Sequence, residues 1–298
     1  MTLGGNSGAI INSPQCAGNS CAQKKRNQRA ALLVVQMTLA TARSIGVFAC
    51  ARHMPRWRPP PRLRTVSPNV RLASWVTASR LRVEVHITPC IVTSPPAACS
   101  ARAAALVNPA NERLQGTQFT PSECNWRLAP GTTLIYPPQV VDGIVSELGG
   151  AALAEARAAL PADSDDVRCQ TGHAVVTAAF GELVACYDLI VHACAPFYHQ
   201  HRRDDWMART TSCYHAAFDA AAAAGASTLA VPLLGAGARG APTADATEAA
   251  VAATTSWAKD AGVLRAACFG VQQEEVALAL ADRLDAVLSR DVECSAGG

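Results

Sequence analysis

The sequence predicts an α/β sandwich with a largely parallel or mixed sheet, preceded by a basic N-terminal extension. Two observations lead to this fold class. Between residues 81 and 292, short runs with strand character alternate with longer runs of helical character, as they do in α/β domains. Half of the 298 residues are hydrophobic and 16% are charged, a composition that supplies a sizeable buried core.

Charge divides the chain into two segments. Residues 1–83 contain 13 lysines and arginines and no acidic residue, whereas the remainder contains 13 basic and 23 acidic residues. Segments of such opposite balance are not expected to form one folded unit. We therefore predict a disordered basic extension over residues 1–80 and a single domain over residues 81–292.

The extension has the composition of an organellar transit peptide, which is rich in arginine and poor in acidic residues. A mitochondrial or plastid location follows if this leader is genuine. A cytoplasmic or nuclear location follows if the leader is not a genuine part of the protein. The apolar run at residues 30–51 is interrupted by Gln36 and Arg43, so no membrane helix is expected. The basic run at residues 24–26 indicates nucleic-acid binding only weakly, because such runs are usually just solvated.

Neither the cysteine nor the histidine spacing predicts a metal site. The 12 cysteines include no Cys-x-x-Cys pair, and several lie inside apolar runs, where cysteine acts as a small hydrophobic residue. His199 and His201 stand near Asp204 and Asp205, but a hydrophilic loop that enters a helix accounts for these four residues. We expect no metal and no cofactor.

Six strands are expected. Residues 81–87 alternate apolar and polar side chains, as a strand with one buried face does. Residues 103–107 form a short apolar run that ends at Asn108. The other four strands are apolar runs, with a turn at Gly181 between the first two of them. They cover residues 174–179, 187–194, 227–234 and 263–269.

Four helices are expected among these strands. The first has a break at Gly149 and Gly150. Asp204 and Asp205 begin the second helix and complement the positive end of its dipole. Pro242 opens the third helix, where its fixed backbone angle fits. The four helices cover residues 140–160, 204–224, 242–259 and 274–288.

The loop after the strand at residues 103–107 is the first that offers side chains suited to binding a ligand. Asn108 and Asn111 each offer hydrogen-bond donors and acceptors, so together they can hold ribose hydroxyls and orient a water molecule. An Asn-Pro turn requires no ligand and explains Asn108 equally well. Ligands of α/β sheets bind beyond the carboxyl ends of strands, which is where this loop lies.

A glycine-rich loop at residues 235–240 lies between a strand and a helix. Glycines let the backbone approach a phosphate closely, and successive N–H groups at a helix start form a cradle for an anion. The pattern Gly-x-Gly-x-x-Gly is a weak signal by itself, and a plain tight turn is the alternative. Asp142 opens another helix, where it either complements the helix dipole or faces the same pocket as Asn111.

Five stretches together resemble the macrodomain family, and they occur in that family's order. The first is similar to the family's Val-Asn-x-Ala-Asn signature, and the second to the Val-Asp-Gly helix start of its hydrolase branch. The resemblance covers residues 103–269 and depends on the whole co-linear set. The five stretches are Val107-Asn108-Pro-Ala-Asn111, Val141-Asp142-Gly143-Ile144, Cys169-Gln-Thr-Gly-His-Ala174, Ile190-Val-His192 and the glycine-rich segment from Leu229 to Pro242.

The resemblance implies a three-layer α/β/α sandwich with a mixed central sheet and a site for ADP-ribose or an ADP-ribosylated protein. It implies that Asn111 and Asp142 are catalytic residues that position a water molecule beside the distal ribose. Residues 235–240 would surround the diphosphate through backbone N–H groups, and Phe269 would lie against the adenine. The implied ligand-binding residues are Asn108, Gly116, Gly143, Ile144, Gly235, Ala236, Gly237, Ala238, Arg239, Gly240 and Phe269.

Three features depart from the family pattern. Residues 117–139 form an insertion that either acts as a lid or blocks the site, and its Trp126 and Tyr136 either stack on a ligand or pack on the domain edge. Residues 91–96 lack the aspartate with which many members read adenine. His173 follows Gly172, where an acidic or amide residue is common in the family.

Two functions of different classes follow. The first is hydrolysis of mono-ADP-ribosyl conjugates or of O-acetyl-ADP-ribose, an Appr-1-p processing activity suggested by Asp142 beside Asn111. The second is non-catalytic recognition of ADP-ribose or another nucleotide diphosphate, suggested by the interrupted glycine run and the missing aspartate. A weaker third interpretation is a scaffold whose pocket the insertion closes. We expect neither a membrane nor a nucleic acid as a partner.

Overall fold

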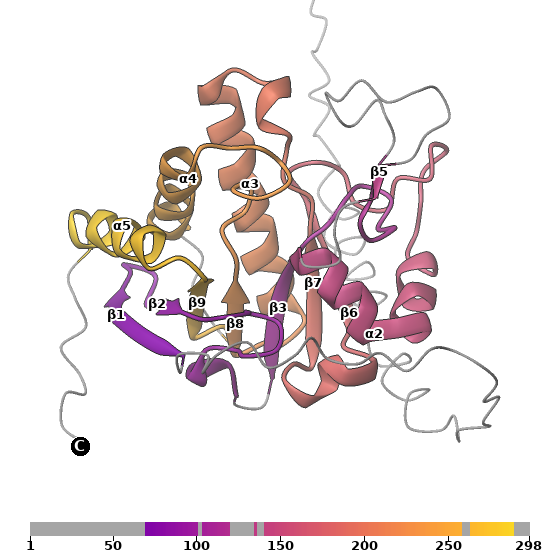
Figure 1. The fold of residues 1–298 in the computed structure, drawn as a ribbon, viewed down its shortest axis with the longest axis horizontal. Helices are drawn as coiled ribbons and strands as arrows, with labels where there is room; N and C mark the ends of the chain where they lie inside the picture. Colours follow the sequence, from indigo (N-terminus) through magenta and orange to yellow (C-terminus); the bar gives the residue numbers. More distant parts are fainter. Residues whose placement is uncertain (1–68, 101–102, 120–133, 136–139, 258–262, 289–298) are drawn as a thin grey trace, which may run out of the picture. The chain divides into compact units, whose positions relative to one another are not determined.

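The computed structural model describes residues 69–100, 103–119, 134–135, 140–257 and 263–288 of the protein. Residues 1–68, with the basic run at 24–26 and the apolar run at 30–51, lie outside this range. Within the described part, no helix has the length and apolarity needed to span a bilayer. The described residues are built around one large mixed sheet (Figure 1).

Five parallel strands form the middle of this sheet, between two antiparallel edge strands. The strand order is β1-β2-β9-β8-β3-β7-β6, in which β1 and β6 are the edges. Parallel pairing brings the carboxyl ends of the five central strands to one end of the sheet. The strands are β1 Val70–Val76, β2 Arg82–Ile87, β3 Ala104–Pro109, β6 Ala174–Ala178, β7 Leu189–Ala193, β8 Thr228–Val231 and β9 Ala266–Val271.

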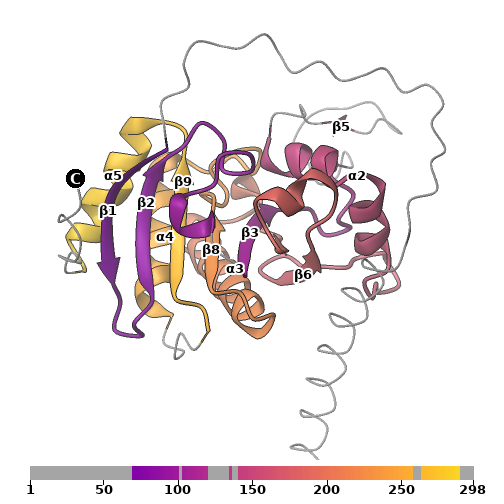
Figure 2. The ribbon, with the colours of Figure 1, turned by 90° about the horizontal axis from the view of Figure 1, so that it is seen from below.

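Helices cover both faces of the sheet, as Figure 2 shows. One face packs against α3 (Arg203–Ala223), α4 (Thr243–Ser256) and α5 (Glu274–Asp285). The opposite face packs against α2 (Val141–Ala158) and two short 3-10 helices, η1 (Ala97–Ser100) and η2 (Gly181–Ala185). The three-layer α/β/α sandwich implied by the resemblance is therefore confirmed.

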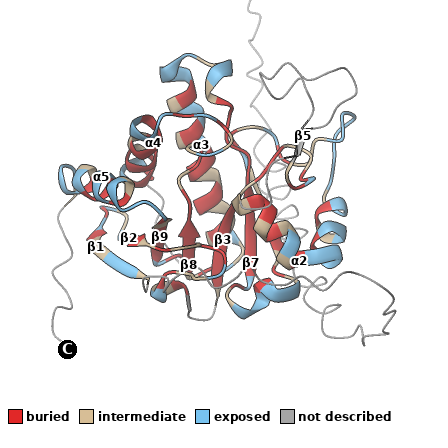
Figure 3. Ribbon diagram, viewed as in Figure 1, coloured by how far each residue is buried: buried red, intermediate tan, exposed pale blue. Residues whose placement is uncertain are grey.

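Two apolar clusters, one on each face of the sheet, form the core. The first includes Tyr214, Phe218 and Phe269, and the second includes Leu106 and Ile190; all five are fully buried. Burying one such side chain stabilises a fold by roughly 1.5–3 kcal/mol. Strands β7 and β8 are buried along their whole length (Figure 3), as continuous apolar runs predict for parallel strands with both faces covered.

The six predicted strands and four predicted helices are all present, with ends that differ by a few residues. The break predicted in the first helix is also present, because Gly150 has φ 59° and ψ −155° inside α2. An L-residue rarely adopts this conformation, so glycine at this position lets the helix change direction. The second half of α2 therefore takes a different course from the first.

The domain begins earlier than the predicted boundary at residue 81, since β1 starts at Val70 and pairs with β2. Trp75 of β1 is fully buried, and its indole N–H donates to Asp285 Oδ1 over 2.9 Å. The charge count concealed this strand because it assigned Arg71 to the basic extension. In the structure, Arg71 Nη1 lies 3.5 Å from Glu84 Oε1, across the boundary that the count suggested.

Candidate functional site

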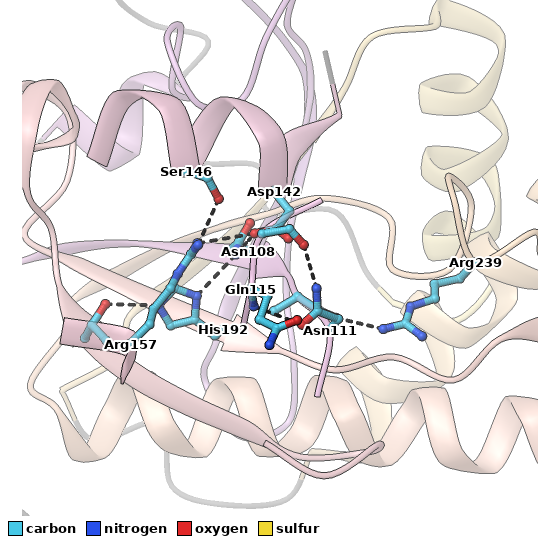
Figure 4. Close-up of polar contacts among 11 residues, drawn as sticks. Asn108, Asn111, Gln115, Asp142, Ser146, Arg157, His192 and Arg239 are labelled. Carbon is cyan, nitrogen blue, oxygen red and sulfur yellow. Dashed lines mark hydrogen bonds and ion pairs between the residues drawn. The ribbon is translucent and has the colours of Figure 1, made fainter. Parts of the chain in front are cut away.

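The carboxyl ends of β3 and β8 carry the two loops predicted to bind a ligand. Asn108 lies near the end of β3, and Asn111 follows in the loop that we call the Asn loop, residues 110–116. The Gly loop, residues 235–240, connects β8 to α4. Asp142 lies in the first turn of α2, close to Asn108 (Figure 4). The stretches that the resemblance assigned to one site are therefore brought together by the fold.

A buried polar network joins β3 to both halves of α2. Asn108 Nδ2 donates to Asp142 Oδ1 over 2.8 Å, and Arg157 Nη2 donates to the same oxygen over 3.2 Å. Arg157 Nη1 also donates to Ser146 Oγ over 2.8 Å. Asn108, Asp142 and Arg157 are all buried, so this ion pair is shielded from solvent and from salt.

His192 of β7 extends the network and is neutral. Its Nδ1 lies 3.2 Å from Asn108 Nδ2, and its Nε2 lies 3.0 Å from Thr177 Oγ1. Burial, together with the charge of Arg157, holds the pKa of His192 well below its usual range. Because Asn108 Nδ2 can only donate, the His192 proton belongs on Nε2, facing Thr177. His192 is therefore a hydrogen-bonded histidine of the core.

The carboxyl group of Asp142 is held in an environment that favours its protonated form. Complete burial raises the pKa of Asp142, against the opposing effects of Arg157, Asn108 and Arg239. A carboxyl group that is removed from water accepts a proton more readily than a solvated one. Perturbed carboxyl groups of this kind concentrate at functional sites.

The side chain of Asn111 hydrogen-bonds within its own loop. Its Nδ2 donates to the carbonyl of Gly116 over 2.5 Å, and its Oδ1 accepts from the backbone N–H of Gln115 over 3.1 Å. Gly116 has φ 76°, which favours glycine, and a Cβ there would lie 3.0 Å from Ser146 Oγ. Asn111 therefore shapes the loop that borders α2, and Gly116 contributes its carbonyl and its close approach to Ser146.

The segment at residues 168–172 braces the Asn loop from outside. The carbonyl of Glu112 accepts from the backbone N–H groups of Arg168 over 2.8 Å and Cys169 over 3.0 Å. The Thr171 hydroxyl donates to the Glu112 carboxylate. The stretch that resembles a family motif thus supports the Asn loop. His173, which departs from the family pattern, is exposed.

The Gly loop is closed by backbone hydrogen bonds and by a tight fit at its start. The N–H of Ala241 donates to Gly235 over 3.0 Å, and that of Gly240 donates to Gly237 over 2.9 Å. Gly235 has φ 86°, and a Cβ there would lie 2.5 Å from Trp206 Cζ2. Gly237 and Gly240 are exposed, and a Cβ at either would meet no atom within 4 Å. The outer turn is therefore open to an approaching ligand.

Arg239 connects the two loops through its side chain. Its Nη2 donates to the carbonyl of Ala110 over 2.9 Å, and its guanidinium lies 4.1 Å from the centre of the Phe197 ring. The side chain is buried, and its charge acts to lower the pKa of Asp142. The sequence suggested only a backbone contribution here, whereas the side chain holds the Gly loop against the Asn loop.

A cleft of about 380 Å³ opens beside the network, between the Asn loop and α2. Its charged lining comprises Arg113, Arg157, Arg168 and Asp166, and Gln115 adds an amide. Arg157 is paired with Asp142 and Arg168 with Asp166, so Arg113 gives the lining its net positive charge, which favours anionic ligands. The buried network therefore lies next to a surface suited to phosphate groups.

Phe269 is not available for a ligand, contrary to expectation. It is fully buried in the middle of β9, and its ring lies 6.2 Å from that of Tyr214 in the core. The predicted strand ended at residue 269, but β9 continues to Val271, so Phe269 points into the layer of α3. Of the two other implied residues in α2, Gly143 is buried and Ile144 is half-buried.

The insertion at residues 117–139 is described only in part. Gln118–Phe119 (β4) pairs antiparallel with Leu134–Ile135 (β5), so the two ends of the insertion lie together. Trp126 and Tyr136 lie outside the described residues. At residues 91–96, the carbonyl of Ser94 accepts from Thr88 Oγ1 over 2.6 Å. This backbone contact does not replace the aspartate that the family uses.

Arg157 was not found from the sequence. It follows Asp142 by 15 residues, which in a straight helix would separate the two Cα atoms by about 22 Å. The break at Gly150 instead turns the second half of α2 so that Arg157 reaches Asp142. An arginine in a predicted helix after a glycine pair was the only signal in the sequence, and no spacing rule connects it to Asp142.

Comparison with known proteins agrees with this geometry. The family model of the macro domain matches residues 107–250, which include the Asn loop, α2 and the Gly loop. The chain contains a macrodomain. No curated protein gives a significant sequence match. The macrodomain described here shares its fold with that of Oceanobacillus iheyensis, solved with ADP, at 17% identity and a TM-score of 0.55, covering 74% of this chain and 98% of that one.

A variant of the same bacterial protein, solved with ADPR, aligns with a TM-score of 0.52 at 17% identity, again over 74% of this chain and 98% of that chain. At this level of identity the likeness shows the fold alone. The roles of individual side chains in the present macrodomain therefore depend on its own geometry.

Proposed function

We propose that this macrodomain binds ADP-ribose across the Asn loop, the start of α2 and the Gly loop. The observation that carries the proposal is the Arg239 bridge. It fixes an amide-rich loop and an open glycine-rich loop side by side at the carboxyl end of the sheet. That end of an α/β sheet is where ligands bind. The fold is shared with macrodomains solved with ADP and with ADPR.

Each part of the ligand has a matching surface. The exposed turn at Gly237 and Gly240, directly before α4, offers backbone N–H groups to a diphosphate. The ribose distal to the adenine would lie toward Asp142 and Asn108, beside the positive cleft. Neither residues 91–96 nor Phe269 offers an adenine contact of the expected kind. We therefore expect the diphosphate and distal ribose to supply most of the affinity.

Calorimetric titration of the full chain tests this proposal. ADP-ribose should bind with a dissociation constant on the order of micromolar, about −8 kcal/mol. AMP and ribose 5-phosphate should each bind at least tenfold more weakly, because each lacks half of the bridging ligand. Absence of heat with ADP-ribose, from protein shown to be folded by circular dichroism, would overturn the proposal.

Hydrolysis of an ADP-ribosyl conjugate is the second candidate function, and the raised pKa of buried Asp142 is the observation that favours it. A general base works best when its pKa approaches the working pH. Against it stands Arg157, whose ion pair with Asp142 occupies the carboxylate that would activate water. Binding alone requires no such proton transfer, so binding is the function that the geometry supports best.

Release of ADP-ribose from mono-ADP-ribosylated protein and from O-acetyl-ADP-ribose separates the two candidates. If the domain is a hydrolase, Asp142→Asn should abolish turnover while ADP-ribose still binds. Asp282→Asn, at an exposed position of α5 on the opposite face of the sheet, should leave turnover unchanged and serves as the control. A wild-type protein that binds ADP-ribose but releases none from either substrate is a reader.

A further inference from the structure

Three side chains with metal-binding atoms meet on one face of the sheet, away from the ligand loops. Glu84 and His86 belong to β2, and Cys268 belongs to β9. Glu84 pairs directly with Cys268, and His86 pairs with Gly270 two positions along, so all three side chains share a face. Their ligand atoms lie within 4.8 Å of one another, and all three are buried. The rest of the described chain contains no comparable group.

The cluster lies on the face that is covered by η1 and is otherwise apolar. Ile91, Cys99 and Ala266 belong to the same core cluster as Cys268. A buried carboxylate in such surroundings is costly unless its oxygens are occupied. A glutamate and a histidine inside an apolar layer therefore call for a specific explanation.

The Glu84 carboxylate is oriented so that one oxygen points to the other two donors. Its Oε1 lies 3.5 Å from Arg71 Nη1 and 3.4 Å from Arg82 Nε. Its Oε2 lies 2.8 Å from His86 Nε2 and 3.7 Å from Cys268 Sγ. Carboxylates that ligate metals typically have such partners on the oxygen that does not face the metal, which here is Oε1.

We propose that Glu84, His86 and Cys268 bind a zinc ion. One carboxylate oxygen, one imidazole nitrogen and thiolate sulfur are donors that Zn²⁺ accepts together. Buried Cys99 of η1 belongs to the same apolar cluster but not to this group of three ligands. Three protein ligands leave one tetrahedral position, which a water molecule would fill.

The distances fit this assignment after a small adjustment. Zinc bonds of about 2.0–2.3 Å place tetrahedral ligand atoms about 3.3–3.7 Å apart. The separation of 3.7 Å between Cys268 Sγ and Glu84 Oε2 already lies in this range. The 2.8 Å between His86 Nε2 and Glu84 Oε2 is a hydrogen-bond distance. Replacing the shared proton by the ion requires these two atoms to separate by about half an ångström.

The charges also balance. A Zn²⁺ ion with the Glu84 carboxylate and the Cys268 thiolate carries no net charge. The ion would join β2 to β9 and would stabilise this side of the sheet. β2 is separated from β3 by β9 and β8, or about 14 Å, so the ion would not touch the ADP-ribose site.

Cobalt titration of the full chain tests the site. The protein is purified with a reductant, freed of metal with a chelator, and titrated with Co²⁺, which gives a thiolate charge-transfer band at a cysteine site. We expect one Co²⁺ per chain at this site, displaced by Zn²⁺, and loss of the band in Cys268→Ser. His86→Gln should weaken binding by more than the 10–100-fold that loss of a supporting partner costs.

The matched control is Cys213→Ser, which removes a buried cysteine from the opposite face and should leave the band unchanged. A folded wild-type protein without the band, or an equal band in Cys268→Ser, would overturn the proposal. X-ray absorption of the zinc-loaded wild type gives an answer even if the Cys268 variant does not fold. It should show a mixed shell of sulfur with nitrogen or oxygen, and a shell of one donor type alone would refute the site.

Discussion

Two of the buried carboxyl groups, those of Asp142 and Glu84, have surroundings that push their pKa values in opposite directions. Asp142 stands at the ligand end of the sheet and Glu84 at its β1–β2 edge, each beside arginine and near a histidine. Burial raises the pKa of Asp142 in spite of Arg157. For Glu84, burial also acts to raise the pKa, but His86, Arg82 and Arg71 together outweigh it, and the pKa is lowered.

The difference shows which cluster is arranged for stability and which for a ligand. Glu84 has two arginine partners, both half-exposed, so its charge is well compensated in the folded state. Asp142 has one buried ionic partner and borders a positive cleft. A carboxyl group kept in a costly environment next to a cleft is the arrangement expected of a functional site.

Replacing an arginine partner of each carboxyl group should give the largest difference in stability between the two clusters. Arg157→Met leaves the Asp142 carboxyl group buried without its cation and should lower the free energy of unfolding by about 3 kcal/mol. Arg71→Met removes a half-exposed partner and should cost about 1 kcal/mol or less. Urea unfolding of both variants measures the difference. Equal losses of unfolding free energy would show that the two arginines stabilise their carboxyl groups equally.

Glycine substitutions test whether close packing of the backbone also stabilises the loops at the carboxyl end of the sheet. Gly235→Ala adds a Cβ 2.5 Å from Trp206 at a positive φ, and should cost about 2–3 kcal/mol. Gly225→Ala, at a positive φ but in open space, should cost about 1 kcal/mol from backbone strain alone. Thermal unfolding compares them. A Gly235→Ala variant as stable as Gly225→Ala would mean that the loop is not tightly seated on Trp206.

The pH dependence of stability gives a smaller effect with a definite sign. The folded state binds the Asp142 proton more tightly than the unfolded state does, because the pKa is raised. This carboxyl group therefore favours folding at low pH, and its contribution is lost as the pH rises through the raised pKa. Asp142→Asn has no such proton, so the wild type should gain stability relative to the variant between about pH 7 and pH 4. A constant difference over this range would contradict the raised pKa.

Periodicity and turn residues were sufficient to predict the layers of this fold. Each predicted strand and helix is present because apolar runs in parallel strands and amphipathic helices follow local rules. β1 was missed because composition, not pattern, was used near residue 80, although Val70–Val76 carries the buried Trp75. Phe269 was misplaced because the strand end was set two residues too early.

The candidate site was predictable only where its residues belong to short motifs. Asn108, Asp142 and the Gly loop were found because each lies at a strand end or a helix start. Arg157 and the side-chain role of Arg239 were not found, since both depend on contacts across the fold. Glu84, His86 and Cys268 come together only through the pairing of β2 with β9, a register that no local pattern specifies.

The central claim is that ADP-ribose lies against the open turn of the Gly loop, and Gly237→Val tests it most directly. A Cβ at Gly237 meets no atom within 4 Å and the residue has no positive φ, so the variant should unfold at the wild-type temperature. Calorimetry should nevertheless show at least a tenfold loss of ADP-ribose affinity, about 1.4 kcal/mol, because the new side chain obstructs the backbone N–H groups. His86→Gln, at the far cluster, should bind as the wild type does. Unchanged affinity in a folded Gly237→Val protein would contradict the account.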